Sequence, residues 1–463
     1  MADERGGGIT RFAAAAALGG FLFGYDSAVV NGAVLGLERT FKTSSAGTGF
    51  AVASILLGCA VGALLAGRVA DAKGRRPVML VAAVTFAVTS FACGLAPSSG
   101  TFTFARFVSG LAVGAASVVC PAYIAEIAPA RSRGRMGSLQ QLGIVLGIFA
   151  ALLADHLLAL AAGGTNEKLW GGFEAWRWMF LVQIVPSFAF AVAVWFIPES
   201  PRYLVAAQEF TAALVVLQRI DPNATAEDVD AIRYTIDKDR QPRFSDLRDE
   251  EGKVHKIVWI GGALSVLQQL VGINSIFYYG DVLWESVGFS ASDSLRNNVI
   301  TGSINVGATV IAILTIDRFG RRPLLLVGSI GMAITLGVLA VAFAGAKSGP
   351  HGIVLSRDAA WAALVAANLY VFAFAVSWGP VVWVLLGEMF PNAFRGAAMA
   401  VAIFAQWMAN WAVTISFPAL VSGLGPVVPY GLYCGFSLVS FFVVRRFVRE
   451  TKGRALEEAS AEG

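Results

Sequence analysis

The sequence predicts an all-helical membrane protein with twelve transmembrane helices in two six-helix halves. Of its 463 residues, 56% are hydrophobic and only 14% are charged, whereas a soluble domain carries roughly 25% charged residues. The apolar residues form long blocks, and motifs in the first half of the chain recur in the second. A soluble enzyme and a disordered chain are therefore excluded. Lys+Arg is 35 against Asp+Glu 31, so no basic surface for nucleic acid is expected either.

The apolar blocks have the length that a membrane-spanning helix needs, about 20 residues. The break at Gly423–Pro426 separates the last two, and no charged residue occurs between Arg395 and Arg445. The predicted spans are 10–36, 47–70, 77–97, 101–126, 136–160, 176–197, 257–282, 295–316, 323–346, 360–387, 396–422 and 426–445.

The basic residues predict the orientation, because cytoplasmic loops carry an excess of Lys and Arg. The loops after spans 2, 4, 8 and 10 and the C-terminal tail are the basic ones, and the opposite loops are poorer in Lys and Arg. The first residues, Met1–Arg5, do not resemble a secretory signal. We therefore expect a multi-pass protein of the cell (plasma) membrane, in contact with the lipid bilayer, with both termini in the cytoplasm.

One polar segment interrupts the apolar pattern and divides the chain. It is rich in both charge signs, with helix-like stretches at 208–220 and 226–239. The predicted organisation is an N-terminal six-helix half at 1–198, a cytoplasmic helical linker at 199–256, a C-terminal six-helix half at 257–447 and a cytoplasmic tail at 448–463.

Three motifs occur once in each half, in the same order. Asp71-Ala-Lys-Gly-Arg-Arg-Pro77 matches Asp317-Arg-Phe-Gly-Arg-Arg-Pro323. The spacing Glu-x-x-Pro-x-x-x-Arg-Gly begins at Glu126 and again at Glu388, and Pro198–Arg202 loosely matches Arg449–Gly453. Such duplication is typical of transporters, which hold their substrate between the two halves.

These motifs allow two interpretations. The basic residues could simply fix the loops in the cytoplasm. Alternatively, the arginines could pair with the acids where helix ends meet, in a cytoplasmic gate that forms when the outside is open and breaks when the inside opens. The gate candidates are Arg75, Arg76, Arg321 and Arg322 with Glu126, Glu199, Glu388 and Glu450.

Charged residues within a membrane span usually mark function. Only Asp26 in span 1 and Arg106 in span 4 are predicted to lie deep in the membrane. They could form a static ion pair that fixes packing. They could instead form a proton-coupling site, because a cycle that makes and breaks the pair would release and bind a proton.

Amide side chains are concentrated in a few of the predicted spans. Amides both donate and accept hydrogen bonds, so they suit an uncharged ligand with many hydroxyl groups better than an ion. Gly272 could unwind span 7 locally and bring Gln268 and Asn274 to one cavity. Hydrogen bonding between helices is the alternative role of such amides. The amides are Gln140, Gln141, Gln268, Gln269, Asn274, Asn305, Gln406 and Asn410.

Aromatic residues complete the predicted lining. Trp383 follows a Gly-Pro break in span 10, and Trp407 adjoins Gln406. A flat indole packs against the apolar C–H face of a sugar ring. Phe23, Tyr278 and Tyr279 are weaker candidates, while Trp170, Trp176 and Trp178 are expected as anchors at the membrane interface.

Together the motifs resemble the sugar porter family of the major facilitator superfamily over the whole chain, most closely its bacterial proton-coupled xylose and glucose symporters. The resemblance implies the major facilitator fold and alternating access. Its proton-coupled members carry Asp at the position of Asp26, and the facilitators carry Asn. Ala375 stands where facilitators carry Glu. The family's sugar-contacting positions correspond to Gln141, Gln268, Gln269, Asn274, Asn305, Trp383, Gln406, Trp407 and Asn410.

The leading hypothesis is therefore a proton-coupled monosaccharide symporter that acts as a monomer, with a neutral sugar and a proton as partners. Glucose is the favoured substrate, followed by xylose and then galactose, arabinose or myo-inositol. A passive sugar or polyol uniporter and a sugar sensor are the alternatives. The four single cysteines, and three histidines placed in loops, predict no metal site. Without a phosphate-loop motif, no catalytic residue or cofactor is expected.

Overall fold

The computed structural model describes residues 3–128, 133–238, 244–249, 251–286, 289–345, 347–349, 352–391 and 394–452. Within them, twelve helical segments are long and apolar enough to cross a membrane. Each coincides with a predicted span to within a few residues. The segments are Ile9–Phe41, Ser45–Lys73, Arg75–Gly94, Ser99–Ile127, Met136–Ala162, Ala175–Phe196, Lys256–Glu285, Ala291–Phe319, Arg321–Ala344, Arg357–Met389, Arg395–Leu424 and Val427–Phe447.

Four of these segments consist of two helices in sequence, and the others are single helices. The first half contains α1 (Asp3–Ala28), α2 (Val30–Phe41), α3 (Ser45–Lys73), α4 (Arg75–Gly94), α5 (Ser99–Ile127), α6 (Arg133–Ala162), α7 (Ala175–Val182) and α8 (Ile184–Phe196). The second contains α12 (Lys256–Leu270), α13 (Ile273–Ser286), α14 (Ala291–Phe319), α15 (Arg321–Ala344), α16 (Arg357–Ala375), α17 (Trp378–Met389), α18 (Arg395–Leu424) and α19 (Val427–Phe447).

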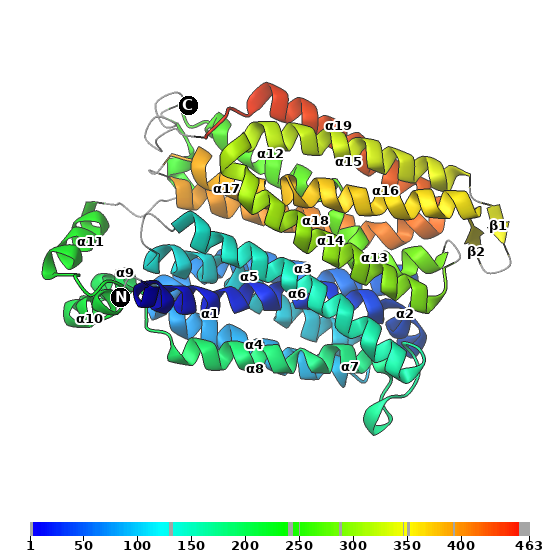
Figure 1. The fold of residues 1–463 in the computed structure, drawn as a ribbon, viewed down its shortest axis with the longest axis horizontal. Helices are drawn as coiled ribbons and strands as arrows, with labels where there is room; N and C mark the ends of the chain where they lie inside the picture. The colour runs from blue at the N-terminus through cyan, green and yellow to red at the C-terminus, as the bar shows by residue number, and fades with distance from the viewer. Residues whose placement is uncertain are drawn as a thin grey trace.

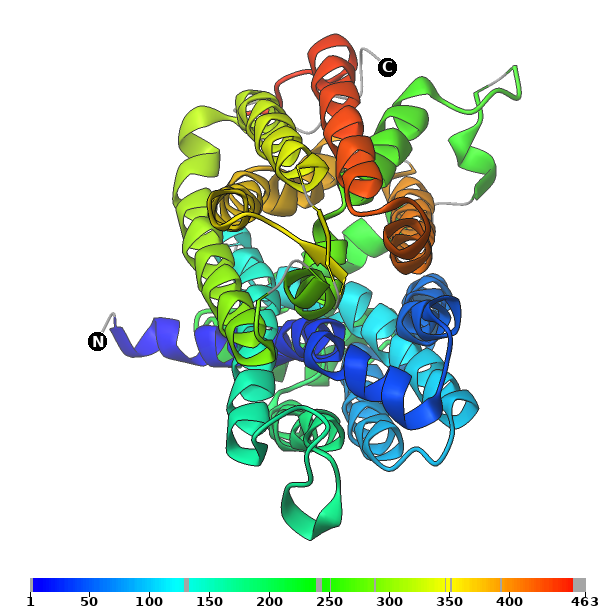
Figure 2. The same ribbon diagram turned by 90° about the vertical axis from the view of Figure 1, so that its right-hand side faces the viewer.

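The two halves lie side by side along the bundle axis (Figures 1 and 2). They meet mainly where α3 packs on α18 and where α6 packs on α14. Between the halves come the linker helices α9 (Pro201–Ala206), α10 (Phe210–Ile220) and α11 (Ala226–Lys238). These project from one end of the bundle, which also carries the duplicated motifs and which we call the motif end (Figure 1).

The opposite end carries a β-hairpin, which the sequence did not predict, and we call it the hairpin end. Strand β1 (Lys347–Gly349) pairs antiparallel with β2 (Gly352–Val354). At this end, α3, α5, α14 and α16 begin at serines whose side chains accept hydrogen bonds from the first turn, which is the preferred N-cap chemistry. The capping residues are Ser44, Ser98, Ser290 and Ser356.

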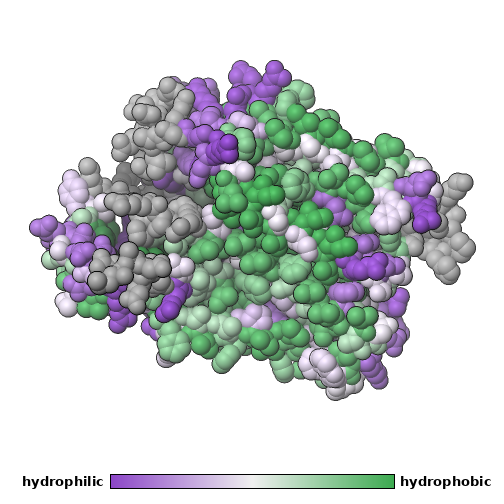
Figure 3. All heavy atoms as spheres, in the orientation of Figure 1, coloured by the Kyte–Doolittle hydropathy of each residue, from purple (hydrophilic) through white to green (hydrophobic). Residues whose placement is uncertain are grey.

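The outer surface of the bundle is apolar where lipid would cover it. A broad hydrophobic band runs between two polar ends (Figure 3). Leu314 and Val341 are 74% and 73% exposed, which is expected of side chains that face hydrocarbon and not of a soluble protein.

Two expectations about single residues were wrong. His156, expected in a loop, lies within α6. Trp176, expected as an interfacial anchor, is fully buried and its indole N–H donates to Thr40 Oγ1 at 3.2 Å. Trp176 is buried because it packs on α2, where its ring centroid lies 5.9 Å from that of Phe41.

Candidate functional site

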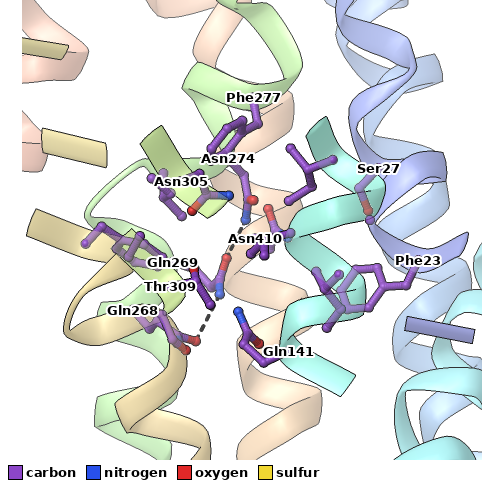
Figure 4. Close-up of a pocket in the computed structure, with 18 of the residues that line it drawn as sticks. Phe23, Ser27, Gln141, Gln268, Gln269, Asn274, Phe277, Asn305, Thr309 and Asn410 are labelled. Carbon is purple, nitrogen blue, oxygen red and sulfur yellow. Dashed lines mark hydrogen bonds between the residues drawn. The ribbon is translucent and has the colours of Figure 1, made fainter. Parts of the chain in front are cut away.

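A pocket lies between the halves, near the middle of the bundle. Its first-half wall comes from α1 and α6, and its second-half wall comes from α12, α13, α14, α16, α17 and α18. The structure brings all the candidate substrate-binding residues of the sequence analysis except Gln140 and Tyr279 to this pocket: Phe23, Gln141, Gln268, Gln269, Asn274, Tyr278, Asn305, Trp383, Gln406, Trp407 and Asn410. Figure 4 shows several of them converging from different helices.

A helix break positions the amides of the second half. Gly272 separates α12 from α13 with φ +85°, a conformation that favours glycine. Asn274 Nδ2 consequently reaches Gln269 Oε1 at 2.6 Å, and Gln269 Nε2 donates to Gln268 Oε1 at 3.3 Å (Figure 4). Gln268 Nε2 ends the chain of hydrogen bonds on the Trp378 carbonyl at 2.8 Å. The predicted unwinding at Gly272 is thus present.

Several polar atoms at the pocket have no partner in the protein. Gln406 Oε1, Trp407 Nε1 and Thr309 Oγ1 are buried without a hydrogen bond, which is rare for native proteins unless water or a ligand completes them. Among the described residues that line the pocket, none carries a charge. The pocket therefore offers donors and acceptors to a neutral molecule with hydroxyl groups.

Two polar lining residues were missed from the sequence. Ser27 and Thr309 both line the pocket. Each lies four residues after a predicted lining residue, Phe23 and Asn305 respectively. Residues four apart share a helix face, so this spacing was the signal that could have found them.

Aromatic side chains close part of the pocket. The rings of Phe23 and Trp407, which belong to different halves, lie 5.5 Å apart at 53°. Trp383 is half-buried at the wall. Tyr279, a weaker candidate, does not line the pocket; its hydroxyl donates to the Thr414 carbonyl at 3.1 Å.

Asp26 and Arg106 form an ion pair inside the first half. Arg106 Nη1 lies 2.7 Å from Asp26 Oδ1 and also donates to the Asp26 carbonyl at 2.9 Å. The Ser109 hydroxyl donates to Asp26 Oδ2. The two charged side chains are 1% and 4% exposed. Asp26 stands next to Ser27 on α1, so this helix carries both the ion pair and part of the pocket wall.

Two more acids are buried within the described spans, although the sequence singled out only Asp26 and Arg106. Asp155 on α6 and Asp281 on α13 are both fully buried. Asp281 stands at the end of the predicted span 257–282, and Asp155 was overlooked because a single acid hardly lowers the hydropathy of a long apolar helix.

At the motif end of the first half, the predicted residues join three helix ends. Arg75 Nη2 donates to Glu126 Oε1 at 3.0 Å, which ties the start of α4 to the end of α5. The backbone N–H groups of Arg75 and Arg76 donate to Glu199 at 3.0 and 3.1 Å. Ser200 Oγ contacts the other oxygen of Glu126.

The second half repeats this arrangement contact by contact. Arg321 binds Glu388 through two parallel hydrogen bonds of 2.7 and 3.0 Å. The backbone N–H groups of Arg321 and Arg322 donate to Glu450 at 2.9 and 3.0 Å. Thr451 Oγ1 donates to Glu388 at 2.6 Å, in the role of Ser200. Gly74 and Gly320 precede the two helices with φ +97° and +91°.

The predicted pairing is correct for Arg75 and Arg321 but wrong for the side chains of Arg76 and Arg322. Arg76 Nη2 donates to the Trp195 carbonyl at 2.6 Å, and Arg322 Nη2 donates to the Arg445 carbonyl at 2.9 Å. The helix N-terminus explains the difference, because Glu199 and Glu450 satisfy its backbone N–H groups first. In the described part of the chain, each of these ion pairs stays within one half.

The two capping acids should respond to pH in opposite senses. Burial raises the pKa of Glu199, although backbone N–H groups oppose this. Burial also acts on Glu450, but the N–H groups of Lys452, Arg321, Arg322 and Thr451 outweigh it and lower its pKa. A lowered pKa means that Glu450 stabilises the fold above the ordinary range of Glu, about 4.3, and that this contribution is lost as the pH falls.

Glu450→Gln is therefore expected to lower stability at pH 7 by about 1 kcal/mol, as for the loss of a helix cap, and to differ less from the parent near pH 4. Thermal unfolding of purified protein at both pH values measures this. Glu199→Gln is the matched control and should cost less at pH 7, because the raised pKa of Glu199 makes its ionised form the unfavourable one. Equal losses for both variants would contradict the assignment.

Arg321→Ala should loosen the motif end. The substitution removes both hydrogen bonds to Glu388, so the ends of α15 and α17 lose their link. A cysteine at position 399 (Met399→Cys), near the start of α18, should then react several-fold faster with a thiol reagent. Arg318→Ala removes a positive charge from the neighbouring last turn of α14 and serves as control. Equal rates in all chains would favour the view that these arginines act on topology only.

A membrane protein with twelve spanning helices and an amide-containing cavity between two six-helix halves belongs to the class of membrane transporters. Residues 12–462 match the family described as "Sugar (and other) transporter". The chain therefore belongs to this family of sugar porters, whose members are transporters and not enzymes.

The relatives support this family throughout the chain. The chain is 51% identical over 446 residues to the "Glucose transport protein" of Synechocystis sp., and the match covers 96% of this chain and 95% of the relative. It is 36% identical over 482 residues to the "D-xylose-proton symporter" of Escherichia coli strain K12, covering 96% and 94%. The solved structure of the proton:xylose symporter XylE bound to 6-bromo-6-deoxy-D-glucose matches with a TM-score of 0.81 and 35% identity, covering 98% of each chain.

Proposed function

We propose that this protein is a proton-coupled importer of a neutral monosaccharide, with glucose as its first substrate, that works by alternating access. The observation that carries this proposal is the buried pair of Asp26 and Arg106 on the helix that also forms a pocket wall. The names of the relatives, one for glucose and one for xylose with a proton, point in the same direction.

The pocket would bind the sugar through its amides and indoles. Hydroxyl groups of the sugar would supply the missing hydrogen-bond partners of Gln406 and Trp407, while Trp383 would cover the apolar face of the ring. The amides from Asn274 to Gln268 are hydrogen-bonded to one another. These bonds hold their remaining donors and acceptors in fixed positions. Such preorganisation favours binding by lowering its entropic cost.

The coupling would act through α1. A proton on Asp26 neutralises one partner of the buried ion pair and weakens the hold of Arg106 on α1. Sugar contacts at Phe23 and Ser27 on the same helix would then favour the movement that exposes the pocket to the other side. The proton would leave Asp26 when the pair with Arg106 forms again.

We further propose that the protein lies in the plasma membrane, with the motif end and both termini facing the cytoplasm. The motif clusters would form the gate on that side. One chain contains the whole pocket, which supports a monomer as the working unit. Lipid would cover the apolar band of Figure 3.

Uptake of a panel of radiolabelled sugars, by cells that lack their own importers, tests the proposal. Glucose is expected to accumulate, xylose less so, and a protonophore should abolish accumulation. Uptake that equilibrates without accumulation and ignores the protonophore would instead identify a passive uniporter. No uptake of any neutral sugar would overturn the proposal.

A further inference from the structure

A second polar cluster lies beyond the pocket, towards the hairpin end, and neither the pocket nor the Asp26 pair includes it. It consists of Asn31 on α2, Asp155 on α6, Asp281 on α13 and Asn298 on α14, all at most 5% exposed. Asp281 follows the pocket residue Asn274 by seven positions, and Asn298 precedes Asn305 by seven. Seven residues are about two turns, so the cluster forms the layer next to the pocket.

Asn31 joins the two halves at this layer. Its Nδ2 donates to the Phe277 carbonyl at 2.9 Å, and its Oδ1 accepts from the Asp281 backbone N–H at 3.0 Å and from Asn298 Nδ2 at 2.9 Å. All these partners belong to the second half. The hairpin side of the pocket is therefore closed by hydrogen bonds that must break before it can open.

The two acids of the cluster lack the partners that a carboxylate needs. Neither oxygen of Asp281 has a hydrogen bond, and Asp155 has one, from the Gly32 N–H to Oδ2 at 3.2 Å. Both side chains are 0% exposed. An ionised carboxylate without a partner is strongly disfavoured in such a place. Asp26 is the contrast, because Arg106 and Ser109 satisfy both of its oxygens.

No cation compensates the two acids in the described part of the chain. Glu285 lies one turn after Asp281, and Arg39 is the cation near Glu285. The titratable and charged groups nearest this layer on the surrounding helices are Tyr25 and Asp26 on α1, Glu38 and Arg39 on α2, Asp155 and His156 on α6, Asp293 and Arg296 on α14, Tyr430 and Tyr433 on α19, and Tyr278, Tyr279 and Glu285 on α13 itself. Asp26 is already paired with Arg106. Arg296 already pairs with Asp293 at 2.8 Å.

We propose that Asp281, with Asp155, is a second proton-binding site that takes up protons when the hairpin side closes. Each carboxylate binds one proton from the water on that side as the halves come together around Asn31. When the halves separate, water reaches the acids and they release the same protons to the same side. The site therefore carries no proton across the membrane, unlike the role proposed for Asp26, but it makes closure depend on pH.

The direction of this dependence follows from linkage. The closed arrangement holds more protons than the open one, so a fall in pH on the hairpin side favours closure. The closed-to-open ratio should change by up to about tenfold per pH unit for each proton taken up. The population of the open arrangement should increase as the pH rises.

A cysteine in place of Val34 provides the readout. Val34 lies three residues after Asn31 and is buried, so opening of the hairpin side should expose it and opening of the motif end should not. Val34→Cys, in a chain whose four native cysteines are replaced by alanine, is labelled with a thiol reagent between pH 5 and 8 without sugar. The same labelling rate is measured in Asp281→Asn, which mimics the protonated acid. Dividing the parent rate by the variant rate at each pH cancels the pH dependence of the thiol itself, because both chains carry the same thiol.

The ratio of the parent labelling rate to the Asp281→Asn labelling rate is expected to rise by up to tenfold per pH unit. Asp155→Asn should make the labelling rate rise less steeply with pH than in the parent. Asp293→Asn, which changes an acid in the first turn of α14 at the same end, should keep the parent profile. The slope should also persist in Asp26→Asn, which separates this site from the coupling proton. Parent and Asp281→Asn profiles that coincide would overturn the proposal. If Asp281→Asn does not fold, the parent labelling rate alone decides: a rate that changes with pH only as the thiolate fraction does would overturn the proposal. Labelling that Na⁺ suppresses at constant pH would replace the proton with a metal cation.

Discussion

Asp26→Asn is expected to abolish the accumulation of sugar against a gradient while leaving sugar binding in place. Asparagine keeps the size of the side chain and accepts hydrogen bonds, but it cannot carry the coupled proton. Because the pocket residues are unchanged, the variant should still bind sugar and exchange labelled for unlabelled sugar across a vesicle membrane. Counterflow and protonophore-sensitive uptake, measured on the same vesicles, separate the two activities.

The stability of this variant must be measured alongside, because Arg106 loses its charged partner. A buried charge without a partner costs about 3–5 kcal/mol, and Arg106 is 1% exposed. Ser109→Ala is the matched control, since it removes the other hydrogen bond to Asp26 but keeps the ion pair and the titrating group. It should retain accumulation. Wild-type, protonophore-sensitive accumulation in Asp26→Asn would show that Asp26 is structural and that another group carries the proton.

The sequence was sufficient to predict the spans and the pocket residues because both depend on local chemistry. Apolar blocks of spanning length have few alternatives in a bilayer, and amides are conspicuous in such blocks. The break at Gly272 was predictable because Gln268 and Asn274 can share a cavity only if the helix unwinds there. The duplicated motifs also placed Arg75 near Glu126 and Arg321 near Glu388.

Features that depend on three-dimensional neighbours could not be predicted in the same way. The side chains of Arg76 and Arg322 bind carbonyls because the helix N-termini already occupy Glu199 and Glu450, and this competition is not visible in the motif. The cluster around Asn31 combines single polar residues from four helices. Each has an ordinary appearance in its own span, and only their meeting gives Asp281 its isolated position.

Gln269→Ala and Trp383→Ala are each expected to weaken sugar binding by roughly 10- to 100-fold without unfolding the protein. Gln269 is the middle of the amide chain, so its loss leaves Asn274 Nδ2 and Gln268 Oε1 without their partners. An unsatisfied buried polar group costs about 1–3 kcal/mol, and 1.4 kcal/mol corresponds to about tenfold in affinity. Trp383→Ala removes the flat surface on which the sugar ring would lie.

Calorimetry on monodisperse protein, with glucose and xylose as titrants, measures both losses. Trp259→Ala is the control for Trp383→Ala, because Trp259 is 70% exposed on α12 and faces away from the pocket. Gln140→Ala is the control for Gln269→Ala, because Gln140 is buried beside Gln141 but does not line the pocket. Both controls should bind sugar as the parent does. Parent-like affinity in Gln269→Ala and Trp383→Ala together would remove this pocket as the sugar site, because one variant disrupts its hydrogen bonding and the other its apolar wall.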